Sequence, residues 1–272
     1  MISALLLLLR PKLSLLNGVA AVSGCLLMPG TLDWKLLFAS FSGVALLAAG
    51  GSALNQALEK DLDSMMLRTR LRPLPQGQLT LSAVIAIGVT IILIGFLLIL
   101  SVGGLLPAMF GIAALIWYLA IYTPLKLRTP FALAIGGICG ALPPIIGWTL
   151  AGGRPTDFRI VLLAGLLYLW QVPHFWLLLR RHEDDYRLAG IALPGTSGRW
   201  GALMGIWITA LVTATILLPA LGVFENQVAL WYVLFPFSLI VMAIMRADKL
   251  LFSCYNLFPL LLAIMLGVQK YL

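Results

Sequence analysis

Amide, carboxylate and guanidinium side chains gather in one polar segment, residues 55–77, which reads NQALEKDLDSMMLRTRLRPLPQG. Asn55, Glu59 and Asp63 stand at positions i, i+4 and i+8, so a helix through this segment would carry them along one face, about 6 Å apart per step. Oxygen donors of this kind suit Mg²⁺, which takes one or two carboxylates and completes its shell with water and substrate phosphates. We therefore predict that these three residues are catalytic and hold Mg²⁺.

Three arginines follow these acids directly, at Arg68, Arg70 and Arg72. A guanidinium fork binds two phosphate oxygens at once, so arginine is well suited to phosphate recognition. Carboxylates beside arginines supply both parts of a site for a Mg²⁺-bound diphosphate. We expect Arg68 and Arg72 to bind that substrate group.

A second segment, residues 177–194, has the same composition in a shorter form and reads LLLRRHEDDYRLAGIALP. It predicts Asp184 and Asp185 as further catalytic acids, Asp185 as a metal ligand, and Arg181 and Tyr186 as substrate contacts. The alternative interpretation of both segments is that their basic residues set membrane orientation and contact lipid headgroups, with acids that only balance the charge.

The composition of the whole chain indicates a membrane protein, in which the two acidic segments connect membrane spans. Of its 272 residues, 61% are hydrophobic and 10% are charged, against roughly 25% charged in soluble domains. We predict one all-α transmembrane domain over residues 1–272, with about nine spans of roughly 20 residues each. The predicted spans are 13–31, 34–54, 79–101, 104–122, 130–150, 158–179, 200–221, 227–245 and 250–269.

The basic residues indicate which ends of these spans face the cytoplasm. Most of the 18 Lys and Arg precede the first span or fall in the connections after spans two, four, six and eight. The positive-inside rule therefore places the N-terminus and both acidic segments in the cytoplasm and the C-terminus on the opposite side. The net charge of +8 is explained by this orientation in a lipid bilayer, and it does not indicate a nucleic-acid partner.

Five sequence blocks, taken in order, resemble a known family. They are RTRLRPLPQG at 68–77, YTPLKLRTP at 122–130, GALPPIIGW at 140–148, WQVPHFW at 170–176 and DDYRLAGI at 184–191. The chain is similar from about Arg10 to Leu193 to the intramembrane UbiA-type prenyltransferases, and most closely to their heme-directed branch. The resemblance implies nine transmembrane helices around a central cavity and Mg²⁺-dependent ionisation of a prenyl diphosphate. For the heme branch it implies farnesyl diphosphate as donor and the vinyl group of protoheme IX as acceptor, which gives heme O.

The resemblance also extends the candidate site. It implies that Lys126 and Arg128 contact the diphosphate, although both would also serve as an ordinary cytoplasmic anchor pair. Tyr122 is one of the aromatic side chains that would face an allylic cation. His174 would approach the heme iron or a propionate, and a packing role for it is the alternative.

Two other functions compete with transfer to heme. The first is prenyl transfer, by an enzyme of the same fold, to an aromatic or quinone precursor. This alternative stays open because Ala192, Leu193 and Pro194 stand where the heme branch carries Pro-Met-Leu-Pro. A transporter is the other. Transporters place ionisable residues near the bilayer midplane, whereas six of the ten acids here lie in the two cytoplasmic segments.

Overall fold

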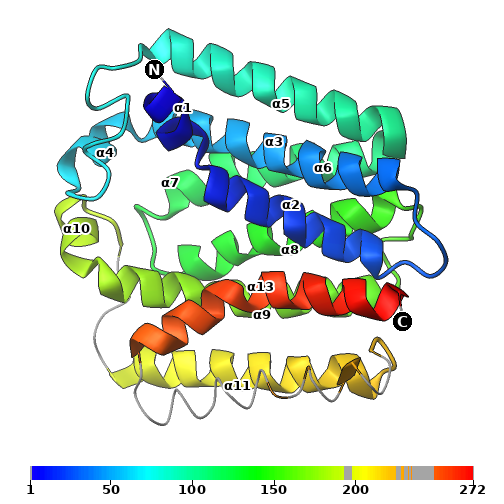
Figure 1. Ribbon diagram of the computed structural model, residues 1–272. Helices are drawn as coiled ribbons and strands as arrows, with labels where there is room; N and C mark the ends of the chain where they lie inside the picture. Colours follow the sequence, from blue (N-terminus) through cyan, green and yellow to red (C-terminus); the bar gives the residue numbers. More distant parts are fainter. Residues whose placement is uncertain are drawn as a thin grey trace.

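The computed structural model describes residues 2–192, 198–224, 228–229, 232, 234 and 248–271. All regular elements in these ranges are helices, most of them long and roughly parallel or antiparallel (Figure 1). In chain order they are α1 (Ile2–Leu9), α2 (Pro11–Leu26), α3 (Trp34–Leu58), α4 (Lys60–Met65), α5 (Leu81–Gly103), α6 (Leu105–Ile116), the π-helix η1 (Trp117–Tyr122), α7 (Thr123–Leu125), α8 (Ala132–Leu150), α9 (Phe158–Arg181), α10 (Glu183–Leu188), α11 (Gly198–Ala220) and α13 (Asp248–Tyr271).

Within the described residues, six stretches are long and apolar enough to cross a bilayer: α3, α5, α6 with η1 and α7, α8, α9, and most of α11. A seventh forms if α1 and α2, which meet at an angle of 46°, count as one span. The predicted span at 227–245 lies almost wholly outside the described residues, and α13 covers the predicted span at 250–269. The all-α multi-pass prediction is confirmed, and the count of nine spans is not.

The two long helices nearest the acidic segments each end in a break that is followed by a short helix. α3 gives way to α4 at Glu59, and α9 gives way to α10 at His182. The N-terminus and both short helices lie at one end of the bundle, and the C-terminus lies at the other end (Figure 1). The fold therefore brings the two acidic segments together, although about 120 residues separate them in the chain.

The opposite end of α9 is fixed by a capping carboxylate. Asp157 accepts hydrogen bonds from the backbone N–H of Arg159 at 3.0 Å and from its guanidinium at 2.9 and 2.7 Å. The hydrogen bond from the Arg159 side chain is the main reason that the pKa of Asp157 falls to about 2. This cap stays ionised over the physiological pH range.

Glycines allow α2 and α8 to cross at backbone contact. A Cβ on Gly147 would lie 1.8 Å from the carbonyl oxygen of Ala21, and one on Gly24 would lie 1.9 Å from that of Pro144. The thiol of Cys25 donates to the carbonyl of Gly147 at 3.0 Å. Small residues at such crossings are typical of membrane bundles, where close van der Waals packing drives helix association.

We expect Gly147→Ala to destabilise the protein by about 1–3 kcal/mol, because the new methyl group meets rigid backbone and not a flexible side chain. The measurement is thermal unfolding in detergent, in which the variant should melt below the wild type. Gly165→Ala is the matched control, since a Cβ at Gly165 in α9 meets nothing within 4 Å. Equal melting of the two variants would contradict a close α2–α8 crossing.

Candidate active site

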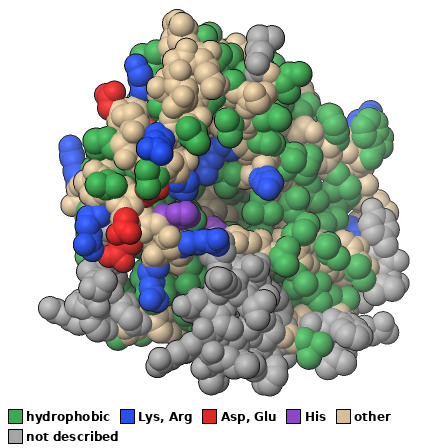
Figure 2. Space-filling view, turned by 60° about the vertical axis from the view of Figure 1, so that its left-hand side comes forward, with side chains coloured by type: hydrophobic (Ala, Val, Ile, Leu, Met, Phe, Trp, Pro, Cys, Tyr) green, Lys and Arg blue, Asp and Glu red, His purple; other side chains and the backbone are tan. Residues whose placement is uncertain are grey.

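A cavity of about 490 Å³ opens among α2, α3, α4, η1, α8 and α9. Figure 2 shows the hollow, with Lys, Arg and His side chains at its margin. One part of the wall is charged or polar and another is apolar, with Leu13, Leu16, Val44 and Leu47 among its members. The charged part consists of Arg10, Lys12, Asn55, Glu59, Asp63, Arg68, Arg72 and Lys126. Such a cavity suits a ligand with an anionic head and a hydrocarbon tail.

Asn55, Glu59 and Asp63 lie on the same wall of this cavity. Helical hydrogen bonding continues through the break between α3 and α4, because the Glu59 N–H donates to the Asn55 carbonyl at 3.0 Å and the Asp63 N–H to the Glu59 carbonyl at 2.8 Å. The three side chains are 6%, 5% and 0% exposed. The predicted shared face is therefore present, and it is buried.

Both acids of this face are paired with cations. A guanidinium nitrogen of Arg72 lies 2.6 Å from Oδ2 of Asp63, and the Lys126 ammonium pairs with Glu59. Arg72 comes from the segment after α4, and Lys126 follows α7. Two cations from separate parts of the chain thus neutralise two buried carboxylates, which would otherwise carry a large desolvation cost.

The second carboxylate oxygen of Asp63 fits a metal ligand. Oδ1 is buried and has no hydrogen-bond partner, which is unusual because buried polar atoms are nearly always paired. No three His, Cys, Asp or Glu side chains of the described ranges converge on one point. A metal held here would take its other ligands from Asn55, Glu59, water and a substrate phosphate, as Mg²⁺ commonly does.

Asp185 contacts the arginine-bearing segment through its backbone. It is 7% exposed, and its two oxygens accept the N–H groups of Leu67 and Arg68 at 3.0 Å each. It is not among the residues that line the cavity, and it does not join Glu59 and Asp63 in one cluster of acids. The structure thus brings the second acidic segment to the first, but by a contact that the sequence did not predict.

The remaining predicted polar contacts separate into two groups. Tyr186 lines the cavity, and its hydroxyl lies 3.4 Å from the Arg68 guanidinium. Asp184, Arg181 and Arg128 are exposed and do not line it. These three side chains are therefore not brought to the cavity wall by this structure.

His182 lies at the break between α9 and α10, where the charges of Arg68, Arg181 and Asp185 act on it. Its burial lowers the pKa of the imidazole, and the positive charges of Arg68 and Arg181 lower it further, against an opposite effect of Asp185. Burial and the neighbouring arginines thus both favour the neutral imidazole.

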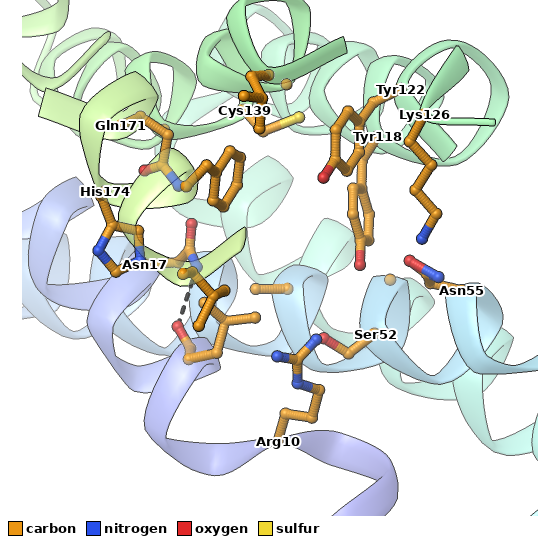
Figure 3. Close-up of a pocket in the computed structure, with 18 of the residues that line it drawn as sticks. Arg10, Asn17, Ser52, Asn55, Tyr118, Tyr122, Lys126, Cys139, Gln171 and His174 are labelled. Carbon is orange, nitrogen blue, oxygen red and sulfur yellow. Dashed lines mark hydrogen bonds between the residues drawn. The ribbon is translucent and has the colours of Figure 1, made fainter. Parts of the chain in front are cut away.

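Aromatic rings form another part of the wall. Tyr118 and Tyr122, both on η1, stack with centroids 6.1 Å apart, and Tyr122 stacks at 6.1 Å on Phe175. His174 stacks on Trp170 with centroids 4.9 Å apart. Figure 3 shows both tyrosines directed into the cavity, with His174 on the α9 side of it. Ring faces directed into an apolar cavity can stabilise a cation.

Arg10 lines the cavity, although its sequence position marks it only as one of the basic residues that precede the first predicted span. It lies at the bend between α1 and α2 with φ 47° and ψ 61°, the only non-glycine residue of the described ranges with positive φ. Its guanidinium approaches Ser52 within the cavity (Figure 3). Strained backbone of this kind costs about 1–3 kcal/mol and is concentrated at functional sites. The one signal in the sequence is Pro11, which disfavours a helical conformation at Arg10.

Comparison with known proteins gives a consistent result. Residues 16–255 match the UbiA prenyltransferase family. A protoheme IX farnesyltransferase of Geobacter sulfurreducens is 54% identical over 265 residues, which cover 96% of this chain and 97% of that protein. A protoheme IX farnesyltransferase of Nitratidesulfovibrio vulgaris is 36% identical over 223 residues, which cover 81% of this chain and 77% of that protein.

Solved structures share the fold. A UbiA homologue from Aeropyrum pernix aligns with a TM-score of 0.76 at 21% identity, covering 95% of this chain and 98% of that one. A UbiA homologue from Archaeoglobus fulgidus, solved with GPP and Mg²⁺, aligns with a TM-score of 0.73 at 14% identity, covering 99% of this chain and 100% of that one. With its amphipathic cavity, its multi-pass helical fold and these relatives, the chain belongs to the UbiA prenyltransferase family of integral membrane enzymes.

Proposed function

We propose that this enzyme transfers the farnesyl group of farnesyl diphosphate to the vinyl group of protoheme IX, with release of diphosphate. Water then adds its hydroxyl to the carbocation formed on the former vinyl group and loses a proton, which gives heme O. The observation that carries the proposal is one cavity that joins buried carboxylates and cations to an apolar and aromatic wall. The names of the relatives that cover most of the chain support the heme acceptor, and the archaeal homologue bound to GPP and Mg²⁺ supports the metal and the diphosphate.

The polar wall would bind the diphosphate. Asn55, Glu59 and Asp63 would hold Mg²⁺, which when bound supplies positive charge that stabilises the leaving diphosphate. Arg72 and Lys126, now paired with the two acids, are within reach of the same space and would bind phosphate oxygens once the acids contact the metal. Their charges then stabilise the negative charge that develops as the carbon–oxygen bond breaks.

The aromatic and apolar wall would take the prenyl chain and the acceptor. Tyr118 and Tyr122 present ring faces that stabilise the allylic cation, and the apolar side chains exclude water that would otherwise quench it. His174, stacked on Trp170, would contact the acceptor.

The same arrangement supports the proposed orientation. The diphosphate head of the substrate is water-soluble. The charged residues of the cavity lie at the start of α2 and the bend before it, on α4 and at the break before it, and in the segments that follow α4 and α7. We place this end, which also carries the N-terminus, in the cytoplasm and the C-terminus on the opposite side (Figure 1).

The proposal is tested by giving the purified enzyme farnesyl diphosphate and Mg²⁺ with two acceptors, in separate and mixed incubations, and identifying products by mass. The vinyl group of protoheme IX should become a hydroxyethylfarnesyl group, a gain of one farnesyl group and one hydroxyl from water, and 4-hydroxybenzoate or a quinone precursor should stay unmodified. Prenylation of the aromatic acceptor alone would keep the fold and the metal site but replace the acceptor.

A variant separates diphosphate binding from acceptor binding. Arg72→Ala should raise KM for farnesyl diphosphate about tenfold or more, since it removes a charge-assisted contact, and should leave KM for protoheme IX nearly unchanged. Arg70→Ala is the matched control because Arg70 is exposed and absent from the cavity wall. Equal losses for both substrates in Arg72→Ala would contradict this assignment.

A further inference from the structure

The loop that carries the site's arginines, residues 66–72 and called here the arginine loop, depends on two carboxylates. At its start, Asp185 accepts the backbone N–H groups of Leu67 and Arg68, at 3.0 Å each. At its end, Asp63 pairs with the side chain of Arg72 at 2.6 Å. The Thr69 hydroxyl also donates to the Asp63 carbonyl at 3.0 Å. The loop is thus bound at both ends.

The backbone geometry explains why a carboxylate is needed at the first end. Met66 is extended, with φ −90° and ψ 131°, and the next residues turn back so that the N–H groups of Thr69 and Arg70 donate to the Met66 carbonyl. The N–H groups of the first two residues of such a turn have no partner within it. Asp185 accepts both, and hydrogen bonds to an ionised acceptor are stronger than neutral ones.

Tyr186, the residue after Asp185, contacts the side chain of Arg68, whereas Asp185 binds the backbone of the same loop. The Arg68 guanidinium lies 5.8 Å from the centroid of the Tyr186 ring, and one of its nitrogens lies 3.4 Å from the tyrosine hydroxyl. Met66 packs in a small buried cluster with Ala189 and Ile191. The α10 segment therefore fixes the start of the arginine loop through backbone, side-chain and apolar contacts together.

We infer that Asp185 is a positioning residue that acts through the arginine loop, and that it is not a ligand of the metal. Its two oxygens hold the backbone that places Arg68 at the cavity wall, while the face formed by Asn55, Glu59 and Asp63 provides the metal ligands. This inference rests on the proposed function in one respect only, namely that the loop arginines bind the substrate diphosphate.

The first test measures the loop itself and needs no substrate. Hydrogen–deuterium exchange of the purified protein should show peptides containing Leu67 and Arg68 exchanging about tenfold faster or more in Asp185→Asn than in the wild type, because a neutral amide cannot accept both N–H groups. Glu183→Gln is the matched control, since Glu183 is on the same short helix and pairs only with Arg187 among the described contacts. Unchanged exchange in Asp185→Asn would overturn the inference.

The second test uses steady-state kinetics. Asp185→Asn should raise KM for farnesyl diphosphate about tenfold and leave the Mg²⁺ concentration for half-maximal rate unchanged. In an Arg68→Ala background the same change should raise KM by less than about threefold, because contacts that act through one residue are not additive. A shift in the Mg²⁺ requirement would identify Asp185 as a metal ligand instead. A KM effect that is fully additive with Arg68→Ala would show that Asp185 does not act through Arg68, and it would also overturn the inference.

A second variant keeps the carboxylate and removes its partner. Leu67→Pro deletes one donor, and proline is accepted at the first position of a turn after an extended residue. It should raise KM for farnesyl diphosphate with no change in Mg²⁺ requirement, even if Asp185→Asn does not fold. Unchanged KM in a folded Leu67→Pro protein would argue against the inference. Absence of any prenyl transfer by the wild type would refute the proposed function, whereas the exchange result would still decide the role of Asp185.

Discussion

Asp63→Asn is expected to lower prenyl transfer by about a thousandfold or more while the protein stays folded. Asp63 is fully buried, it binds Arg72 through Oδ2, and its Oδ1 has no partner. The substitution preserves the shape of the side chain and removes its charge, so metal binding and the stabilisation of the leaving group are lost. A loss of about 4 kcal/mol in transition-state stabilisation, of the size expected for a bound metal, corresponds to this factor.

The measurement is product formation under saturating substrates, with thermal unfolding as the check on folding. Asp61→Asn is the matched control, because Asp61 is on the same short helix but is exposed and absent from the cavity wall. It should retain nearly wild-type turnover. Turnover by Asp63→Asn at the level of Asp61→Asn would remove Asp63 from the site.

Lys126→Met is expected to destabilise the substrate-free protein and to make its stability depend on Mg²⁺. The Lys126 and Glu59 side chains are 17% and 6% exposed, and breaking a buried ion pair leaves an uncompensated charge that costs about 3–5 kcal/mol. Mg²⁺ at the acidic face would replace the missing cation. Transfer activity should fall as well, since one diphosphate contact is lost.

Thermal unfolding with and without Mg²⁺ measures this effect. The variant should melt below the wild type in chelator and should recover most of the difference when Mg²⁺ is added. Lys60→Met, which alters an exposed lysine of α4, should behave like the wild type in both conditions. If Mg²⁺ does not raise the stability of Lys126→Met, the pair with Glu59 is not at the metal face.

The acidic face could be predicted from the sequence because it depends on local geometry. Asn55, Glu59 and Asp63 recur every four residues, and the hydrogen bonds that define this spacing persist through the break at Glu59. The break itself was not predicted. It leaves Glu59 alone between the end of α3 and the start of α4, and the apolar pattern of α3 gives no sign of it.

The contacts between distant segments could not be predicted in the same way. Residue type and membrane side place Asp184, Asp185 and Arg128 near the site, but they do not determine where each side chain points. Asp185 turns to a backbone that lies 117 and 118 positions away in the chain, while Asp184 and Arg128 are exposed. Such directions depend on how α10 packs against the arginine loop.

Arg10, in contrast, lies at the cavity although the sequence did not predict it there. Its position before the first predicted span makes it an orientation signal by composition, yet the bend between α1 and α2 brings it into the cavity. The predicted first span, 13–31, therefore misses the first segment of the bent pair, which begins at Ile2. A short apolar helix before a proline carries no amphipathic pattern that would reveal this bend.

We propose that the face formed by Asn55, Glu59 and Asp63 holds a divalent metal together with the substrate diphosphate. The most direct measurement is electron paramagnetic resonance of Mn²⁺, used in place of Mg²⁺, with and without a non-reactive farnesyl thiolodiphosphate. We expect the diphosphate analogue to tighten Mn²⁺ binding by the wild type and by Asp61→Asn, and to have no such effect on Asp63→Asn. Equal Mn²⁺ binding by Asp63→Asn and the wild type in the presence of the analogue would contradict the account.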